Sequence, residues 1–192
     1  MYPEVFIHPT AVIDAGAQIG AGTKVWHFTH LMPQCRIGAY CMLGQNVFVD
    51  NNVVVGDGVK IQNNVSLYNG VRVEDAVFIG PSVVFTNVSN PRSFMERKHE
   101  FKQTLICTGA SIGANATILC GIEIGSYALV GAGSVVTQSV PSFAVVYGNP
   151  ARQQGWISKG GYALTFNEKG EAFCNPEGKR YILQGGRVAL AD

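Results

Sequence analysis

Residues 43–61 read LGQNVFVDNNVVVGDGVKI, and a large apolar side chain recurs at every sixth position from Leu43 to Ile61. The same step extends in both directions without a gap, from Ile7 to Phe85. A small or β-branched side chain follows four residues after nearly every one of these positions, and Gly, Asn, Asp, Gln and Ala fill most of the rest. A period of six fits neither an α-helix nor a single long strand.

Six residues suffice for one short strand and one tight turn, so three repeats close a triangular coil. Coils of this kind stack about 4.8 Å apart, with the apolar and plus-four side chains inside and the turns in water. The pattern therefore predicts a β-solenoid, in which each coil is buried only against its neighbours. The open ends and strand edges of such a prism favour association, and three prisms side by side would form a cyclic trimer.

The repeat is interrupted once. Residues 86–105 are polar and charged and do not fit the period, which resumes at Ile106 and continues to Val136. A segment between two regular stretches must leave the prism, so we expect an extruded loop over 86–105. Two domains follow from this reading: the solenoid over 1–157, and a C-terminal β extension over 158–192, where alternating residues around two turn sequences predict hairpins or a small sheet.

The composition excludes several classes of protein. The formal charge is +1, so neither nucleic acid nor an anionic membrane is an expected partner. No apolar run approaches the roughly 20 residues of a membrane span, and the N-terminus does not resemble a signal peptide. The five cysteines show neither paired nor zinc-binding spacing. We therefore expect a cytoplasmic protein without a metal.

The repeat has the form aliphatic, Gly/Ala/Asp, two variable positions, a small residue and one more variable position. It resembles the hexapeptide signature of the left-handed β-helix acyltransferases, and residues 124–152, IGSYALVGAGSVVTQSVPSFAVVYGNPAR, are similar to the end of the helix in that superfamily. The resemblance implies an all-β, left-handed parallel β-helix. The spacing itself does not show the hand, and the usual crossover rule would favour the right hand.

A narrower resemblance lies in VWHFTHL (25–31), KIQNNVSLYNGV (60–71), FTNVSNPRS (85–93) and GNPARQQGW (148–156). These stretches are similar to sugar-nucleotide N-acetyltransferases that acetylate the C3 amine of UDP-2-acetamido-3-amino-2,3-dideoxy-glucuronic acid, a precursor of bacterial surface polysaccharide. The resemblance implies acetyl-CoA as cosubstrate, a UDP-linked amino sugar as acceptor, and a homotrimer with its sites between subunits.

Candidate site residues follow from the same resemblance. Asn87, where the loop departs, is expected to accept a hydrogen bond from the amine nucleophile and so to orient it. Arg97, together with Arg92, is expected to contact the sugar, Arg97 at its carboxylate. The candidates for the uridine diphosphate are Lys60, Gln62, Asn63 and Tyr68. From residue size and charge, the pantetheine arm of acetyl-CoA is expected to pair with exposed backbone at the small residues Gly109, Ala110, Ala128 and Val146. The candidates for its nucleotide phosphates are Arg152 and Lys159. Single Asn, Ala and Gly residues also have an ordinary explanation, because tight turns use them.

The histidines leave the mechanism open. His99 in the loop and His30 are the candidates for a general base. The resembling branch needs no side-chain base, because a sugar amine is partly neutral near pH 7 and the departing thiolate can take the proton. Two alternatives to the main reading remain. One is an acetyltransferase for another acceptor, such as a dTDP-3-amino sugar, a UDP-4-amino sugar or a serine. The other is a non-CoA solenoid, either a scaffold or a γ-carbonic-anhydrase-like enzyme with three converging histidines.

Overall fold

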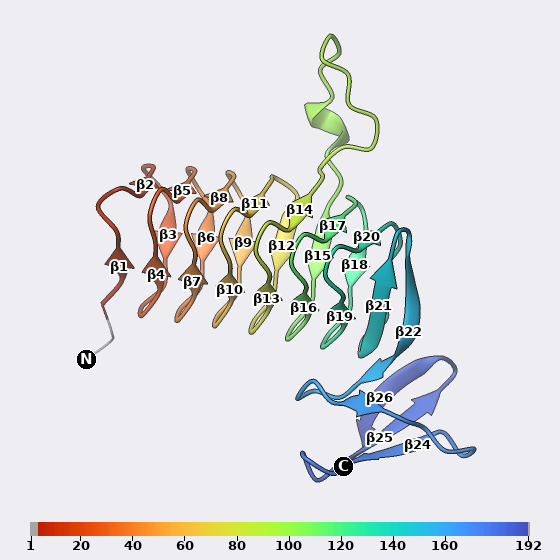
Figure 1. Ribbon diagram of the computed structural model, residues 1–192. Coiled ribbons are helices and arrows are strands. Elements are labelled where there is room, and N and C mark those ends of the chain that lie inside the picture. Colours follow the sequence, from red (N-terminus) through yellow and green to blue (C-terminus); the bar gives the residue numbers. More distant parts are fainter. Residues whose placement is uncertain (1–3, 192) are drawn as a thin grey trace.

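The computed structural model describes residues 4–191, and it is a three-sided prism of short parallel strands (Figure 1). Sheet A contains β1 (Phe6–Ile7), β4 (Lys24–Val25), β7 (Met42–Leu43), β10 (Lys60–Ile61), β13 (Phe78–Ile79), β16 (Ser111–Ile112), β19 (Leu129–Val130), β21 (Ala144–Gly148), β22 (Ala151–Ile157) and β23 (Ala163–Leu164). Sheet B contains β2 (Val12–Ile13), β5 (His30–Leu31), β8 (Phe48–Val49), β11 (Ser66–Leu67), β14 (Val84–Phe85), β17 (Thr117–Ile118) and β20 (Val135–Val136). Sheet C contains β3 (Gln18–Ile19), β6 (Arg36–Ile37), β9 (Val54–Val55), β12 (Val71–Val73), β15 (Thr104–Ile106) and β18 (Glu123–Ile124). We call the turns that join the sheets the A–B, B–C and C–A corners.

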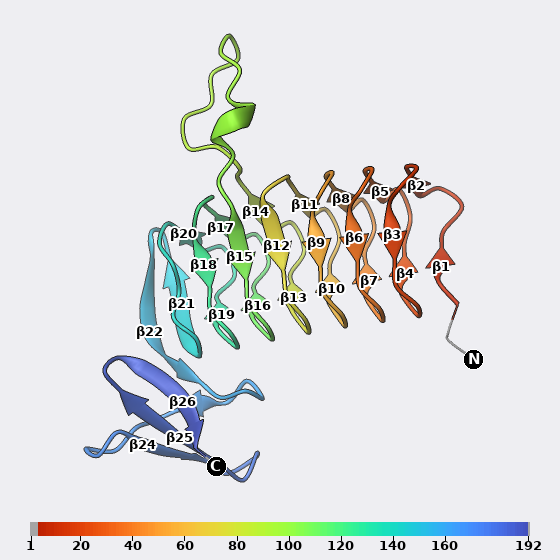
Figure 2. The same ribbon diagram turned by 180° about the vertical axis from the view of Figure 1, so that it is seen from behind.

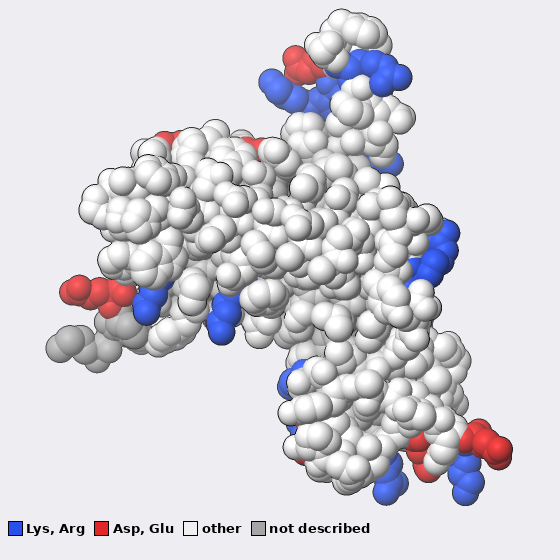
Figure 3. Space-filling view, viewed as in Figure 1, with Lys and Arg blue, Asp and Glu red and all other residues white. Residues whose placement is uncertain are grey.

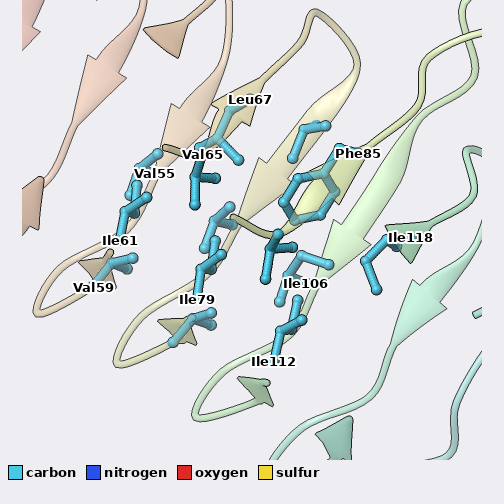
Figure 4. Close-up of a cluster of buried hydrophobic side chains, with 14 of the residues drawn as sticks. Val55, Val59, Ile61, Val65, Leu67, Ile79, Phe85, Ile106, Ile112 and Ile118 are labelled. Carbon is cyan, nitrogen blue, oxygen red and sulfur yellow. The ribbon is translucent and has the colours of Figure 1, made fainter. Parts of the chain in front are cut away.

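The apolar repeat forms the core of the prism. Side chains at the six-residue positions and at plus four fill its interior, and Ile61, Val65 and Leu67 are fully buried (Figure 4). The one clear departure is Ile7, which is 42% exposed because it lies in the first coil and no coil stacks on its outer side. Burial of a few apolar atoms in every coil, rather than one central cluster, is what stabilises a solenoid.

The corners explain much of the asparagine content. Asn46, Asn52, Asn64 and Asn115 have φ angles between 57° and 62°, the left-handed region that asparagine tolerates better than most residues. For these four residues the turn explanation is sufficient. Asn87 is not among the residues with positive φ.

The loop changes the sequence spacing between paired strands, but the coils on its two sides still stack on each other. Neighbouring strands pair 18 residues apart, as Ser66 does with Phe48, whereas Val84 pairs with Thr117, which is 33 residues later. The excess of 15 residues is the extruded loop, which contains one 3-10 helix, η1 (Lys98–Glu100). β15 begins at Thr104, so the last two residues of the expected loop lie in a strand instead, because Thr104 and Leu105 pair with β12.

The chain ends in a small antiparallel sheet. β21 and β22 form a hairpin on the last coil, and β24 (Glu171–Cys174), β25 (Lys179–Gln184) and β26 (Arg187–Ala191) form what we call the tail sheet. The loop and the tail sheet project from the prism on opposite sides in both views (Figures 1 and 2). The expected all-β, left-handed parallel β-helix with one loop and a C-terminal β extension is confirmed. The described residues contain no helix of the length and apolarity needed to cross a bilayer.

Candidate active site

Asn87 lies at the base of the loop on the B–C corner. Its carbonyl oxygen accepts a hydrogen bond from the Lys102 N–H (2.9 Å), which brings the two ends of the loop together. The preceding residue, Thr86, accepts a hydrogen bond from the Cys120 N–H through its hydroxyl (2.9 Å). The Asn87 side chain is partly exposed, and its amide makes no hydrogen bond within residues 4–191. The backbone is therefore fixed while the amide remains available to a ligand.

A groove runs along the outer face of sheet C beside this loop base. Its first part has a volume of about 630 Å³ and is lined by Asn69, Gly70, Arg72 and Gln103 among others. It shares Glu123 and Ser139 with a second hollow of about 530 Å³ that the Gly185–Arg187 turn of the tail sheet borders. The groove thus connects the loop base on the B–C corner with the tail sheet on the other side of sheet C.

The loop carries an excess of positive charge. It contains four basic residues (Arg92, Arg97, Lys98, Lys102) and two acidic ones (Glu96, Glu100), a net charge of +2 with histidine neutral, and blue side chains surround it in Figure 3. The Arg97 guanidinium is already engaged, since one of its nitrogens contacts both carboxylate oxygens of Glu100 at 2.7 and 2.9 Å. Arg92 donates a hydrogen bond to the carbonyl of its neighbour Pro91 (2.9 Å). A substrate carboxylate would have to displace Glu100 or use the backbone N–H of Arg97.

The residues predicted for the uridine diphosphate do not form one pocket within a protomer. Lys60 points outward from sheet A, and Gln62 and Asn63 follow it on the A–B corner, whereas Tyr68 lies on the B–C corner with Asn87. Five residues of extended chain separate Asn63 from Tyr68, about 16 Å at 3.3 Å per residue. The Asn63 side-chain oxygen also accepts the Gln45 N–H (2.8 Å), so it already serves the packing of the coils.

Three of the residues predicted to contact acetyl-CoA belong to the core instead. Ala110, Ala128 and Val146 are between 0% and 5% exposed. Ala110 and Ala128 occupy plus-four positions, Val146 pairs with the six-residue position Val130, and side chains at these places point into the prism. The Ala110 carbonyl accepts the Phe78 N–H and the Ala128 carbonyl accepts the Ser111 N–H, so these backbone groups are used between coils. The side chains of these three residues therefore do not reach the surface, and the predicted pairing of the pantetheine arm with the backbone at these positions stays a prediction.

Gly109 and Lys159, in contrast, both contact Tyr127, a residue of the C–A corner. The Tyr127 ring packs so closely against Gly109 that a Cβ atom there would collide with it, and Gly109 has φ +71°. The Lys159 ammonium lies 5.1 Å from the centre of the same ring. Arg152 is elsewhere, because it pairs with Tyr147 at the far end of the β21–β22 hairpin. It precedes Lys159 by seven positions, about 23 Å of extended chain.

The histidines are dispersed. His30 contacts Asp14 at 3.0 Å on the outer face of sheet B, three coils before β14, which is about 14 Å along the prism. His99 lies in the loop, 3.6 Å from Glu100. His8 stacks on His27 with ring centres 3.4 Å apart, and partial desolvation, followed by repulsion from His27, lowers the pKa of His8. Within one protomer only His99 belongs to the loop that carries Asn87, and among residues 4–191 no group of three potential metal ligands occurs.

Comparison with protein families identifies the family to which the six-residue repeat belongs. The model described as "Bacterial transferase hexapeptide (six repeats)" matches residues 16–51, 52–87 and 103–138, which is more than half of the chain. The chain belongs to the bacterial transferase hexapeptide family. A second model, the hexapeptide repeat of succinyl-transferase, matches residues 34–69.

Two curated relatives are similar to part of the chain. The chain is 47% identical over 89 residues to a dTDP-3-amino-3,6-dideoxy-alpha-D-galactopyranose 3-N-acetyltransferase of Aneurinibacillus thermoaerophilus, covering 46% of this chain and 45% of the relative. It is 41% identical over 76 residues to a 2,3,4,5-tetrahydropyridine-2,6-dicarboxylate N-acetyltransferase of Staphylococcus aureus, covering 40% and 29%. The chain therefore matches less than half the length of either relative.

Three solved structures agree with the hexapeptide fold. The hexapeptide-repeat acetyltransferase VCA0836 of Vibrio cholerae is 30% identical with a TM-score of 0.54, covering 67% of this chain and 74% of that one. WeeI of Acinetobacter baumannii is 26% identical with a TM-score of 0.53, covering 77% and 57%. The perosamine acetyltransferase PerB of Caulobacter crescentus, solved with CoA and GDP-perosamine, is 21% identical with a TM-score of 0.52, so its likeness shows the fold alone.

Sequence reasoning missed the residues that line the sheet C groove. Arg72 precedes a six-residue position, and the repeat alone indicates that such side chains point outward. Nothing in the repeat showed that this face of the hexapeptide solenoid, rather than sheet A, is hollowed. The first part of the groove is lined by sheet C and the B–C corner with Gln103 at the end of the loop, and the second part also by the Gly185–Arg187 turn of the tail sheet.

Proposed function

We propose that this chain transfers the acetyl group of acetyl-CoA to the C3 amine of a nucleotide-linked 3-amino sugar. The observation that carries the proposal is the free amide of Asn87 at the closed base of the extruded loop, beside the sheet C groove. Membership of the hexapeptide transferase family and the similarity to a dTDP-3-amino sugar 3-N-acetyltransferase support the reaction class.

The reaction needs an oriented amine more than a strong base. The amine nitrogen attacks the thioester carbonyl, the C–N bond forms, the C–S bond breaks, and the amine proton ends on the departing thiolate to give CoA–SH. The Asn87 side-chain oxygen accepts one amine N–H, which directs the nitrogen lone pair at the carbonyl. Holding two reactants in this way can supply much of the reduction in the barrier.

At the level of the acceptor, we propose the carboxylated sugar UDP-2-acetamido-3-amino-2,3-dideoxy-glucuronic acid. The net charge of +2 on the loop and the presence of Arg97 favour an anionic acceptor. A thiol-release assay with four acceptors tests this: the UDP-linked 3-amino glucuronate, a dTDP-3-amino dideoxy sugar, a UDP-4-amino sugar and serine. We expect turnover of both 3-amino sugars and the highest kcat/KM with the carboxylated one. A preference for the dTDP sugar would refute the finer proposal, and a preference for the 4-amino sugar or serine would refute both.

We further propose that the site is shared between copies in a homotrimer. Within one protomer Asn87 lies on the B–C corner, whereas Gly109 and Lys159 lie on the C–A corner, so the width of sheet C separates the acceptor and donor candidates. A neighbouring copy can bring the two corners together. Sedimentation equilibrium should then give about three times the 20.6 kDa chain mass; an active monomer would contradict this arrangement.

The histidine variants separate this mechanism from general base catalysis. His99→Asn and His30→Asn should each lower kcat less than tenfold, because the thiolate can take the proton. Steady-state kinetics at saturating acetyl-CoA measures this. A hundredfold loss at His99 with unchanged circular dichroism would instead make it the base, since general bases contribute about 10²- to 10⁴-fold.

A further inference from the structure

A buried tyrosine connects the tail sheet with the C–A corner. Tyr181, in β25, is fully buried, and its hydroxyl oxygen accepts a hydrogen bond from the Lys159 backbone N–H (2.9 Å). The same hydroxyl donates to a carboxylate oxygen of Glu177 (2.9 Å). Both partners of the hydroxyl are thus fixed, and the backbone at Lys159 is attached to the core of the tail sheet.

The ionisation of the pair supports these hydrogen-bond directions. Burial raises the pKa of Tyr181, so the hydroxyl keeps its proton at neutral pH. Burial opposes the charge on Glu177, but hydrogen bonds from Ser158, Cys174 and Tyr181 outweigh it and lower the pKa of the carboxyl. Tyr181 is therefore the donor to Glu177 and has a lone pair free for the Lys159 N–H.

A second contact path leads from Tyr181 to the Lys159 ammonium. The Tyr181 ring meets Phe143 edge-on with ring centres 5.8 Å apart, and Phe143 stacks on Tyr127 at 5.3 Å. The Lys159 ammonium lies over the Tyr127 ring, a cation–π contact. Tyr181 therefore supports Lys159 both at its backbone and beneath its side chain.

The ammonium held in this way is available to an anion. Lys159 is exposed, and it forms no ion pair with any described carboxylate. An exposed ammonium whose backbone and stem are both fixed loses less conformational freedom on binding a phosphate than a mobile surface lysine does.

We propose that Tyr181 is a positioning residue of the acetyl-CoA site, which holds Lys159 on the C–A corner where its ammonium binds a phosphate of the nucleotide portion of the cosubstrate. This inference rests on the proposed function. It makes the tail sheet part of the binding site rather than a separate appendage. The chemistry predicts a contribution to KM and not to kcat, since the phosphates lie at the end of the cosubstrate away from the thioester.

The test compares acetyl-CoA with acetyl-pantetheine, which lacks the nucleotide phosphates. Tyr181→Phe should raise the KM for acetyl-CoA about fivefold, and Lys159→Ala about tenfold, with kcat changed less than twofold. Neither should change the KM for acetyl-pantetheine. The double variant should be no worse than Lys159→Ala, because the two residues act through one contact. Tyr162→Phe, a tyrosine of the same segment that is 47% exposed, is the control and should leave every parameter unchanged.

The outcomes distinguish the two proposals. If the wild-type protein turns over neither cosubstrate with any 3-amino sugar, the proposed function fails. The inference is overturned if the wild-type protein turns over both cosubstrates but Tyr181→Phe raises the KM for acetyl-CoA and for acetyl-pantetheine by the same factor. It is also overturned if the double variant has a higher KM for acetyl-CoA than Lys159→Ala alone. In either case Tyr181 is only a structural residue. If Tyr181→Phe unfolds below the assay temperature, Glu177→Gln is tested in its place. This variant keeps the tyrosine but weakens the acceptor of its hydroxyl. It must also raise the KM for acetyl-CoA without changing the KM for acetyl-pantetheine.

Discussion

Replacing Asn87 with alanine is expected to lower kcat about 100-fold, because the amine then loses the acceptor that aims its lone pair at the thioester. The loss should fall on kcat more than on the KM for either substrate, because the nucleotide and the sugar are held elsewhere. Asn87→Asp keeps an oxygen at the same place and should retain more activity than the alanine variant. Steady-state kinetics with each substrate varied in turn measures these parameters.

The matched control for Asn87 is Asn90→Ala, three residues further along the loop. Asn90 is exposed, so its loss should change kcat less than twofold. Equal losses at both positions would indicate a general effect on the loop. An unchanged kcat in Asn87→Ala would show that the amide does not meet the nucleophile.

Replacement of the loop residues 88–101 by Gly-Gly should lower kcat/KM about 1,000-fold while the prism stays folded. The two ends are already adjacent, because the Asn87 carbonyl accepts the Lys102 N–H at 2.9 Å. The helix η1 contains no buried residue, and the strands on both sides keep their pairing through β14–β17 and β12–β15. A short connection also costs little closure entropy. The loop therefore adds little to the core, and under the proposed function its removal costs substrate binding.

Thermal unfolding and circular dichroism verify that this shortened protein is intact, and its Tm should lie within about 3 °C of the wild-type value, which corresponds to roughly 1 kcal/mol for a chain of this size. If the protein keeps more than a tenth of its activity, the loop is not a wall of the site. If it unfolds, the separation of loop and core described above is wrong.

The repeat made the fold predictable, and its limits explain the errors at the site. Ile61 and Leu67 are buried as the six-residue period requires, since every coil repeats the same environment. The same period places the side chains of Ala110 and Ala128 inside the prism, so their small size leaves only their backbone as a candidate contact for acetyl-CoA. Size alone does not decide exposure in a solenoid, because turns and interior both use small residues.

Features that depend on contacts between distant segments could not be predicted from the sequence. The second hollow of the groove is bordered by the Gly185–Arg187 turn of the tail sheet, and no local pattern in the repeat encodes that contact. The hydrogen bond between Lys159 and Tyr181 likewise spans 22 residues and depends on how the tail sheet packs. Asn87 stays a prediction: the break in the repeat locates the point where the loop leaves the prism, and the resemblance implies an asparagine with a role there.

The most direct test of the account is the position of the transferred acetyl group. The protein should convert acetyl-CoA labelled with carbon-13 at the carbonyl, together with a UDP-linked 2-acetamido-3-amino sugar, into CoA–SH and an amide whose labelled carbonyl correlates by NMR with the proton on C3. Transfer to the C3 amine would be contradicted if the labelled acetyl group were found on a hydroxyl oxygen or on the nitrogen of another carbon. It would also be contradicted if a folded protein transferred no label.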